Sequence, residues 1–259
     1  MYWGDETATQ AARVVHFQTN HKEGYRLLTH FYTFIHTTTP AHERRMKRFI
    51  RDRFRYIDPI LCAAYRAVSA LRARGGGAYS AIHARRGDFQ YKQVKVSAEV
   101  MASTLGPDVF KRGEVVFIAT DEKNRSFFTP LATGLGVELA FIEDVAGVAR
   151  LSELNPNFAG IVELVIAAES RSFAGTWFST FSGYINRLRG YRGLDGRSSF
   201  YHYQKKRDEM HTWAPLKTPF YSVERPFGWF DLDDDSGDGA VGPVGPFPPD
   251  RRLLRAPDR

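Results

Sequence analysis

The feature of this chain that most constrains its fold is a short apolar run, Tyr79 to Ile82, that leads directly into the charged segment His83-Ala84-Arg85-Arg86-Gly87-Asp88. Gly75-Gly76-Gly77 precedes the run, so the pattern predicts a buried strand that follows a flexible turn. In open α/β sheets, ligands bind in the crevice at the carboxyl ends of the strands. Because the planar guanidinium of Arg85 can donate to two phosphate oxygens at once, the segment predicts a diphosphate ligand.

Strand and helix patterns alternate through the middle of the chain. The predicted strands are Tyr79 to His83, Val115 to Ala119, Val137 to Phe141 and Ser172 to Ala174, and the predicted helices are Ser97 to Leu105, Glu122 to Leu131, Phe158 to Ser170 and Ser179 to Leu188. This alternation with short connections is typical of a parallel sheet flanked by helices. It predicts an α/β, Rossmann-like fold with right-handed crossovers.

The residues before this pattern predict a helical lead-in. We expect a short strand at residues 13 to 17 and a basic amphipathic helix at Arg44 to Ile57. Asp58 would cap a second helix, with Pro59 in its first turn. The arginines of the first helix are most simply a solvated face.

The end of the chain differs in composition, since residues from Tyr221 onward are rich in Pro, Gly and Asp and predict disorder. Asp231-Leu232-Asp233 matches the Asp-x-Asp pattern of some metal sites, but a metal site needs ligands held in fixed geometry, so we expect none there. The expected organisation is a lead-in over residues 1–75, an α/β domain over 76–218 and a disordered tail over 219–259.

Charge and composition limit the partners. The chain has 259 residues and a net charge of +7, and the excess of basic residues lies before Pro219. This favours an anionic partner such as a nucleotide, although solubility alone could also explain it. No apolar run is long enough to span a membrane, and the first six residues are too polar for a signal peptide, so we expect an incomplete chain. Cys62 is the single cysteine, which excludes an internal disulfide.

Two further strand ends carry polar residues. Ala119-Thr120-Asp121-Glu122 fits either a ligand contact or an ordinary helix cap. In Gly175-Thr176-Trp177-Phe178-Ser179-Thr180-Phe181-Ser182, a glycine permits a tight turn and hydroxyl residues open a helix. The N–H groups and positive dipole end of that helix suit a phosphate, while a plain Ser/Thr cap is the alternative.

These three segments, in this order, resemble the signatures of the GDP-fucose-dependent fucosyltransferases, specifically the protein O-fucosyltransferases and their α-1,6-fucosyltransferase relatives. The resemblance covers residues 13 to 192 and corresponds to the C-terminal, donor-binding half of a two-domain GT-B enzyme. About 75 residues precede the first signature, and the Gly-rich signature that normally opens the N-terminal domain is missing from them. A catalytically inactive nucleotide-binding or regulatory remnant of the family is therefore the alternative to an active enzyme.

The resemblance implies a set of residues that bind GDP-fucose, namely His83, Arg85, Asp88, Asp121, Glu163, Ser179, Thr180 and Phe181. Arg85 would bind the β-phosphate and would be the catalytic group. His83 would approach the nucleotide, and the segment from Ser179 to Phe181 would bind the diphosphate. Glu163 occupies the position of an acid that recognises guanine, where the family carries Asp.

The resemblance also implies a reaction and its partners. Fucose would pass from GDP-fucose to a protein or glycan hydroxyl with inversion at C1, and neither a metal nor another cofactor would be needed. We expect no nucleic-acid partner, because the chain shows no recognised RNA- or DNA-binding module. The family resemblance implies the lumen of the ER or Golgi as the compartment.

Overall fold

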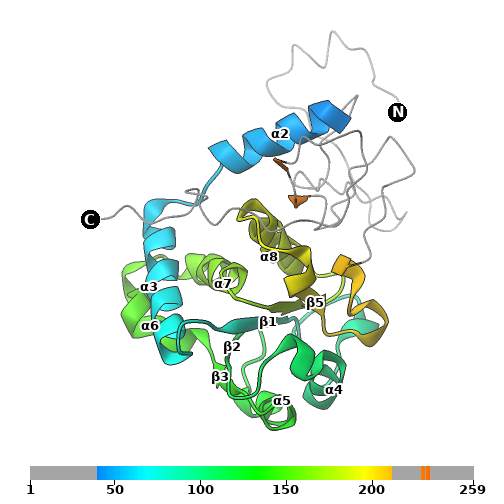
Figure 1. Ribbon diagram of the computed structural model, residues 1–259. Helices are drawn as coiled ribbons and strands as arrows, with labels where there is room; N and C mark the ends of the chain where they lie inside the picture. The colour runs from blue at the N-terminus through cyan, green and yellow to red at the C-terminus, as the bar shows by residue number, and fades with distance from the viewer. Residues whose placement is uncertain (1–39, 212–228, 231, 234–259) are drawn as a thin grey trace, which may run out of the picture.

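The computed structural model describes residues 40–211, 229–230 and 232–233, so the predicted strand at residues 13–17 and most of the predicted tail lie outside the described residues. The described residues form a five-stranded, wholly parallel sheet in the order β3-β2-β1-β4-β5 (Figure 1). The strands are β1 Ser80–Ala84, β2 Val115–Thr120, β3 Glu138–Ala140, β4 Phe173–Gly175 and β5 Ser199–Tyr201. The predicted α/β, Rossmann-like fold is confirmed.

The register brings the carboxyl ends of the central strands to one edge. In β1, Ala84 lies opposite Thr120 of β2, and Ile82 lies opposite Ala174 of β4. Every residue of β1 is buried, as is typical of a central strand covered by helices on both faces. The segment that begins at Arg85 therefore leaves the sheet between the segments that follow β2 and β4.

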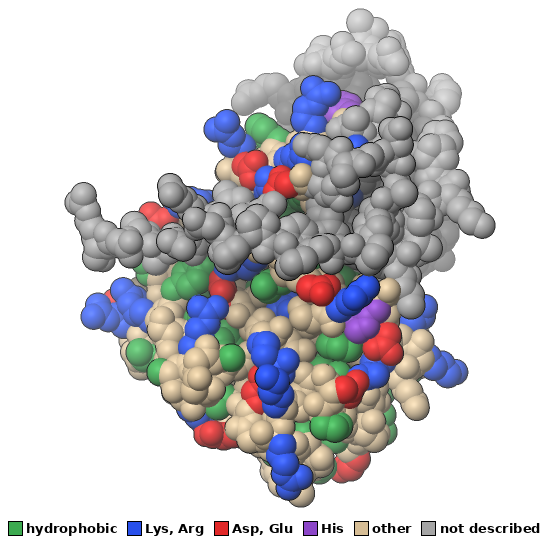
Figure 2. Space-filling view, in the orientation of Figure 1, with side chains coloured by type: hydrophobic (Ala, Val, Ile, Leu, Met, Phe, Trp, Pro, Cys, Tyr) green, Lys and Arg blue, Asp and Glu red, His purple; other side chains and the backbone are tan. Residues whose placement is uncertain are grey.

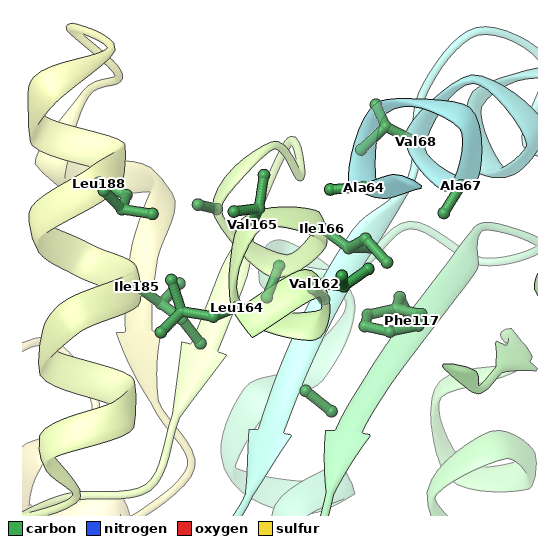
Figure 3. Close-up of a cluster of buried hydrophobic side chains, with 14 of the residues drawn as sticks. Ala64, Ala67, Val68, Phe117, Val162, Leu164, Val165, Ile166, Ile185 and Leu188 are labelled. Carbon is green, nitrogen blue, oxygen red and sulfur yellow. The ribbon is translucent and has the colours of Figure 1, made fainter. Parts of the chain in front are cut away.

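Helices cover both faces of the sheet. On one face lie α3 Asp58–Arg74, α6 Ile142–Ala149, α7 Ala159–Ala168 and α8 Thr180–Tyr191, and on the other lie α4 Ala98–Val109 and α5 Thr129–Leu135 (Figure 1). Figure 3 shows the core of the first face, where side chains of α3 and α7 lie near Phe117 of β2 and side chains of α8 pack against α7. Alternate strand residues serve the two cores, since Phe117 faces the first and Ile118 the second.

The second predicted helix starts later than expected. The sequence predicts a helix from Glu122 to Leu131, but α5 begins at Thr129 after a short 3-10 helix, Arg125–Phe128. Asn124 explains the delay, because its side-chain oxygen accepts from the N–H of Ser126 and stabilises a turn instead. The sequence analysis also missed α6 and β5, which are too short to show a clear period.

The lead-in helices differ from the prediction in their ends and in their packing. α2 covers Pro40–Arg53 and so ends before the predicted Ile57. α3 begins at Asp58, but Ile57 occupies the cap position, and Asp58 lies in the first turn where its charge suits the helix dipole. Because α3 shares the core of the sheet, the predicted boundary at residue 75 does not separate two cores. No helix of the described ranges is long and apolar enough to cross a bilayer.

A small part of the predicted disordered tail is ordered. Trp229, Phe230 and Leu232 are buried, and the Trp229 ring lies 5.7 Å from the ring of Tyr191 in α8. A side chain at Gly190 would clash with Trp229, because its Cβ would lie 2.7 Å from the Trp229 carbonyl oxygen. The prediction of disorder is therefore wrong for these residues, because three large apolar side chains supply a local anchor that the average composition conceals.

The same segment explains some of the arginines of α2. Arg51 pairs with the carboxylate of Asp233 at 2.9 Å, and Arg48 donates to the carbonyl of Leu232. The interpretation of the arginines as a solvated face is therefore wrong for these two. They bind α2 to the segment that contains Trp229 and Leu232.

Arg189 of α8 is a fully buried cation that joins three parts of the fold. Its guanidinium donates to the carbonyl of Ser170 at 2.7 Å and to the hydroxyls of Ser198 and Ser199 at 2.6 and 2.8 Å. Burial lowers the pKa of Arg189 to about 9. These contacts fix α8 to the turn before β4 and to the start of β5, so Arg189 sets the position of the helix whose other end reaches the carboxyl edge.

We expect Arg189→Met and Arg189→Lys to destabilise the protein by roughly 3 kcal/mol, because each leaves buried carbonyl and hydroxyl oxygens without donors. Urea unfolding followed by circular dichroism measures the loss. Arg197→Met, at an exposed position, is the matched control and should change the free energy of unfolding by less than about 0.5 kcal/mol. Equal stability of the Arg189 variants and this control would contradict the prediction.

Candidate functional site

The end of β1 and the turn after β4 are joined by a buried hydrogen-bond network centred on Thr176. The Thr176 hydroxyl donates to the carbonyl of His83 at 3.0 Å and accepts from the N–H of Arg85 at 2.9 Å. The Ser182 hydroxyl accepts from the N–H of Thr176 at 2.9 Å and lies 2.7 Å from Nδ1 of His83. Two of the three predicted segments are therefore locked together at the carboxyl edge of the sheet.

His83 lies inside this network. Its ring is buried and stacks on Phe181 at 4.6 Å, in the first turn of α8. Burial, together with the neighbouring His202, lowers the pKa of His83 to about 3, so the ring is neutral at physiological pH. The structure thus shows His83 positioning the start of α8, while the predicted contact with the nucleotide stays a prediction.

Arg85 lies at the rim of the site. Its guanidinium pairs with the carboxylate of Asp121 at 2.8 Å and donates to the backbone carbonyl of Asp88 at 3.0 Å, while 40 % of the side chain stays exposed. Asp88 is itself exposed. Arg86 points elsewhere, since it donates to the carbonyl of Val96 and lies over the ring of Phe127. Only the first arginine of the pair therefore presents its guanidinium at the carboxyl edge.

Asp121 holds the loop that carries Arg85. Its two carboxylate oxygens accept from the N–H groups of Arg86 and Gly87 at 2.6 and 3.0 Å. Burial alone would raise the pKa of Asp121, but these donors and the Arg85 charge outweigh it and lower the pKa. A side chain at Gly87 would meet the carboxylate at 2.6 Å, so the close approach requires glycine there. Asp121 braces the loop and does not cap the helix that follows.

The start of α8 is open to an anion. Ser179 occupies the cap position, yet its side chain makes no capping hydrogen bond, so the alternative of a plain Ser cap is wrong. The first N–H groups of a helix have no partners within the helix, and the dipole makes this end positive. Thr180 is exposed beside them, and Phe181 is held by His83. Backbone donors and two hydroxyls therefore lie beside the Arg85 loop, as a phosphate site requires.

Glu163 of α7 lies near the end of β2, where its carboxyl accepts from the backbone N–H of Thr120. Burial, followed by the nearby charge of Glu143, raises the pKa of Glu163 to about 8. The carboxyl is therefore largely protonated at neutral pH. A partly buried carboxyl with a strongly raised pKa at the ligand edge of a sheet is a frequent mark of a functional group.

Sequence reasoning missed His202, which follows β5. It is buried, and its Nε2 lies 2.9 Å from the Thr176 hydroxyl. Burial lowers the pKa of His202 to about 4, so it extends the neutral network. Nothing in the local sequence marks this histidine, since its partner lies 26 positions away. In the described ranges, no group of three or more His, Cys, Asp or Glu side chains is placed to hold a metal ion.

The site has the features of a nucleotide-binding α/β protein, because an arginine loop, a helix start and a partly buried acid lie along the carboxyl edge of a parallel sheet. The family model for the GDP-fucose protein O-fucosyltransferases matches residues 6–192, and the chain belongs to this family. The resemblance inferred from the three sequence segments is thereby confirmed. No curated protein matches the chain.

We expect Asp121→Asn to weaken GDP binding by roughly tenfold, because the amide can accept only one of the two loop N–H groups and no longer pairs with Arg85. Isothermal titration calorimetry with GDP measures the change. Glu153→Gln, at an exposed site on the surface, is the control and should bind GDP like the unaltered protein. An unchanged affinity in Asp121→Asn would show that the loop does not depend on this carboxylate.

Proposed function

We propose that this protein transfers fucose from GDP-fucose to a serine or threonine hydroxyl of a protein or to a glycan hydroxyl, with inversion at the fucose C1 carbon and without a metal ion. Membership of the family supports a fucosyltransferase that uses GDP-fucose. The observation that carries the proposal is that Arg85 and the uncapped start of α8 lie at the same edge of the sheet, where the N–H of Arg85 donates to Thr176 in the turn before α8.

The proposed chemistry uses these groups to stabilise the leaving diphosphate. When the bond between C1 and the phosphate oxygen breaks, negative charge builds on the β-phosphate. Arg85 and the N–H groups at Thr180 and Phe181 are fixed before the reaction by Asp121 and His83, so little reorganisation is required. Each such preorganised donor contributes on the order of 10²-fold to 10³-fold in rate.

The acceptor hydroxyl also has to lose a proton. His83 and His202 are buried and held in the hydrogen-bond network of Thr176, and their lowered pKa values make both weak bases. We therefore propose that both histidines hold the site in shape and that neither acts as the base. We propose that the base belongs to the acceptor-binding part of the enzyme, as in the relatives where a carboxylate of the N-terminal domain serves.

The described α/β unit is proposed to be the donor-binding half of a GT-B enzyme, working in the lumen of the ER or Golgi. The alternative of an inactive remnant gains no support from the family match. On the face drawn in Figure 2, lysine and arginine side chains are spread over the described surface and lie beside acidic ones, which differs from the clustered basic patch of nucleic-acid-binding proteins. We keep the prediction that the acceptor is not a nucleic acid.

Selectivity for guanine tests the proposal. The ionised Glu163 carboxylate matches the paired N1 and N2 donors of guanine, whereas uracil would leave this carboxylate unpaired. We expect the protein to bind GDP at least tenfold more tightly than UDP in calorimetry, with EDTA present throughout. Glu163→Gln should remove most of the preference, because its amide cannot accept two hydrogen bonds in this geometry. Equal affinity for GDP and UDP in the unaltered protein would overturn the proposal.

The raised pKa of Glu163 predicts a pH dependence of GDP binding. The free protein holds a proton on this carboxyl below about pH 8, and guanine recognition requires its loss. The affinity for GDP should therefore rise as the pH rises, by up to about tenfold per pH unit, and level off above pH 8. Glu163→Gln provides the control, since any pH dependence left in this variant belongs to GDP or to other groups. Identical pH profiles for the two proteins would contradict the assignment.

A further inference from the structure

A row of aromatic rings lies beside the proposed phosphate site. The ring of Tyr91 stacks on Phe178 at 4.6 Å, and Phe89 and Trp177 extend the row, at 5.4 Å from Tyr91 and 5.3 Å from Phe178. Phe89 and Tyr91 belong to the loop between β1 and α4, while the other two belong to the turn between β4 and α8. The row therefore joins the same two segments that supply Arg85 and the start of α8.

Phe178 departs from the usual behaviour of a large apolar residue in two ways. Its side chain is 51 % exposed, although burial is favourable for a phenyl ring. Its backbone has φ of 64°, in the left-handed region that bulky residues rarely adopt. Strained backbone of this kind collects at functional sites, where the surrounding structure holds a side chain in a required place. Here the strained conformation places a phenyl ring at the surface directly before Ser179.

The position of the row follows the order of groups in a sugar nucleotide. Glu163 lies near the end of β2, Arg85 follows β1, and Ser179 follows β4, so the sheet order places them one after another along the carboxyl edge. If the base is at Glu163 and the diphosphate is at the two central segments, the sugar extends past Ser179. Phe178 lies on that side, since its neighbour Trp177 contacts the ring of Tyr201 in β5, and Tyr91 stacks on Phe178.

We propose that the stacked rings of Tyr91 and Phe178 form the subsite for the transferred sugar and contact its apolar face and the methyl group at C6. This inference rests on the proposed function. Fucose is a 6-deoxyhexose, so its C6 carries no hydroxyl that would need a hydrogen-bond partner. A hydroxyl pressed against these rings would lose water without compensation, so the subsite favours a deoxy sugar over its hydroxylated counterpart.

The test compares three ligands by calorimetry on the full chain, namely GDP, GDP-L-fucose and GDP-L-galactose, which differs from GDP-L-fucose by one hydroxyl at C6. The unaltered protein should bind GDP-L-fucose roughly tenfold more tightly than GDP-L-galactose. Phe178→Gly should reduce this ratio to near one and leave the affinity for GDP within about twofold. Because glycine readily adopts the left-handed conformation, this variant keeps the turn folded. Phe178→Tyr, which retains a ring, should restore the preference.

Phe49→Ala is the matched control, since Phe49 of α2 is equally exposed at 51 % and should not affect the ratio. A ratio near one in the unaltered protein, or an unchanged ratio in Phe178→Gly, overturns the subsite while GDP binding leaves the proposed function intact. A Phe178→Gly variant that changes only the KM for the acceptor also overturns it, because the rings would then serve the acceptor. Failure of the unaltered protein to bind GDP removes the proposed function itself.

Discussion

The hydrogen bonds of the Thr176 side chain are the contact on which the site depends. This one hydroxyl binds the carbonyl of His83 and the N–H of Arg85 and lies 2.9 Å from Nε2 of His202. It therefore links the carboxyl ends of β1, β4 and β5. The partners are buried or partly buried polar groups that would be costly to leave unpaired. The parallel register puts these strand ends side by side, and the hydrogen bonds fix their relative positions.

Asp121 supplies the electrostatic counterpart of this network. It neutralises Arg85 and binds the backbone of the loop, so the arginine is held in place without being buried. A phosphate approaching the rim would meet a guanidinium whose position is already set and which is still partly exposed to solvent. The conformational entropy of this long side chain is lost when the protein folds and not when a ligand binds. This is what preorganisation of a site means.

The sequence could predict what depends on neighbours along the chain and little of what depends on neighbours in space. The strand before His83, the glycine turn at Gly175 and the helix after it are local patterns, and the structure has them close to where they were expected. The brace from Asp121 to Gly87 and the network of His202 span the fold, and no local pattern encodes them. The anchor at Trp229 was hidden for the same reason, since its partners lie on α8.

The three parts of the proposed donor site rely on different physics, and this separates recognition from catalysis. The diphosphate would meet the permanent charge of Arg85 and the positive end of a helix. The sugar would meet uncharged rings at Phe178. Only the base would meet a group, Glu163, whose charge depends on pH and on the burial that raises its pKa to about 8. Guanine binding at Glu163 would therefore require this carboxyl to lose a proton, whereas the proposed stabilisation of the leaving phosphate would not. In such a site, the choice of nucleotide would depend on the protonation of Glu163. The groups that lower the activation barrier would take no part in that equilibrium.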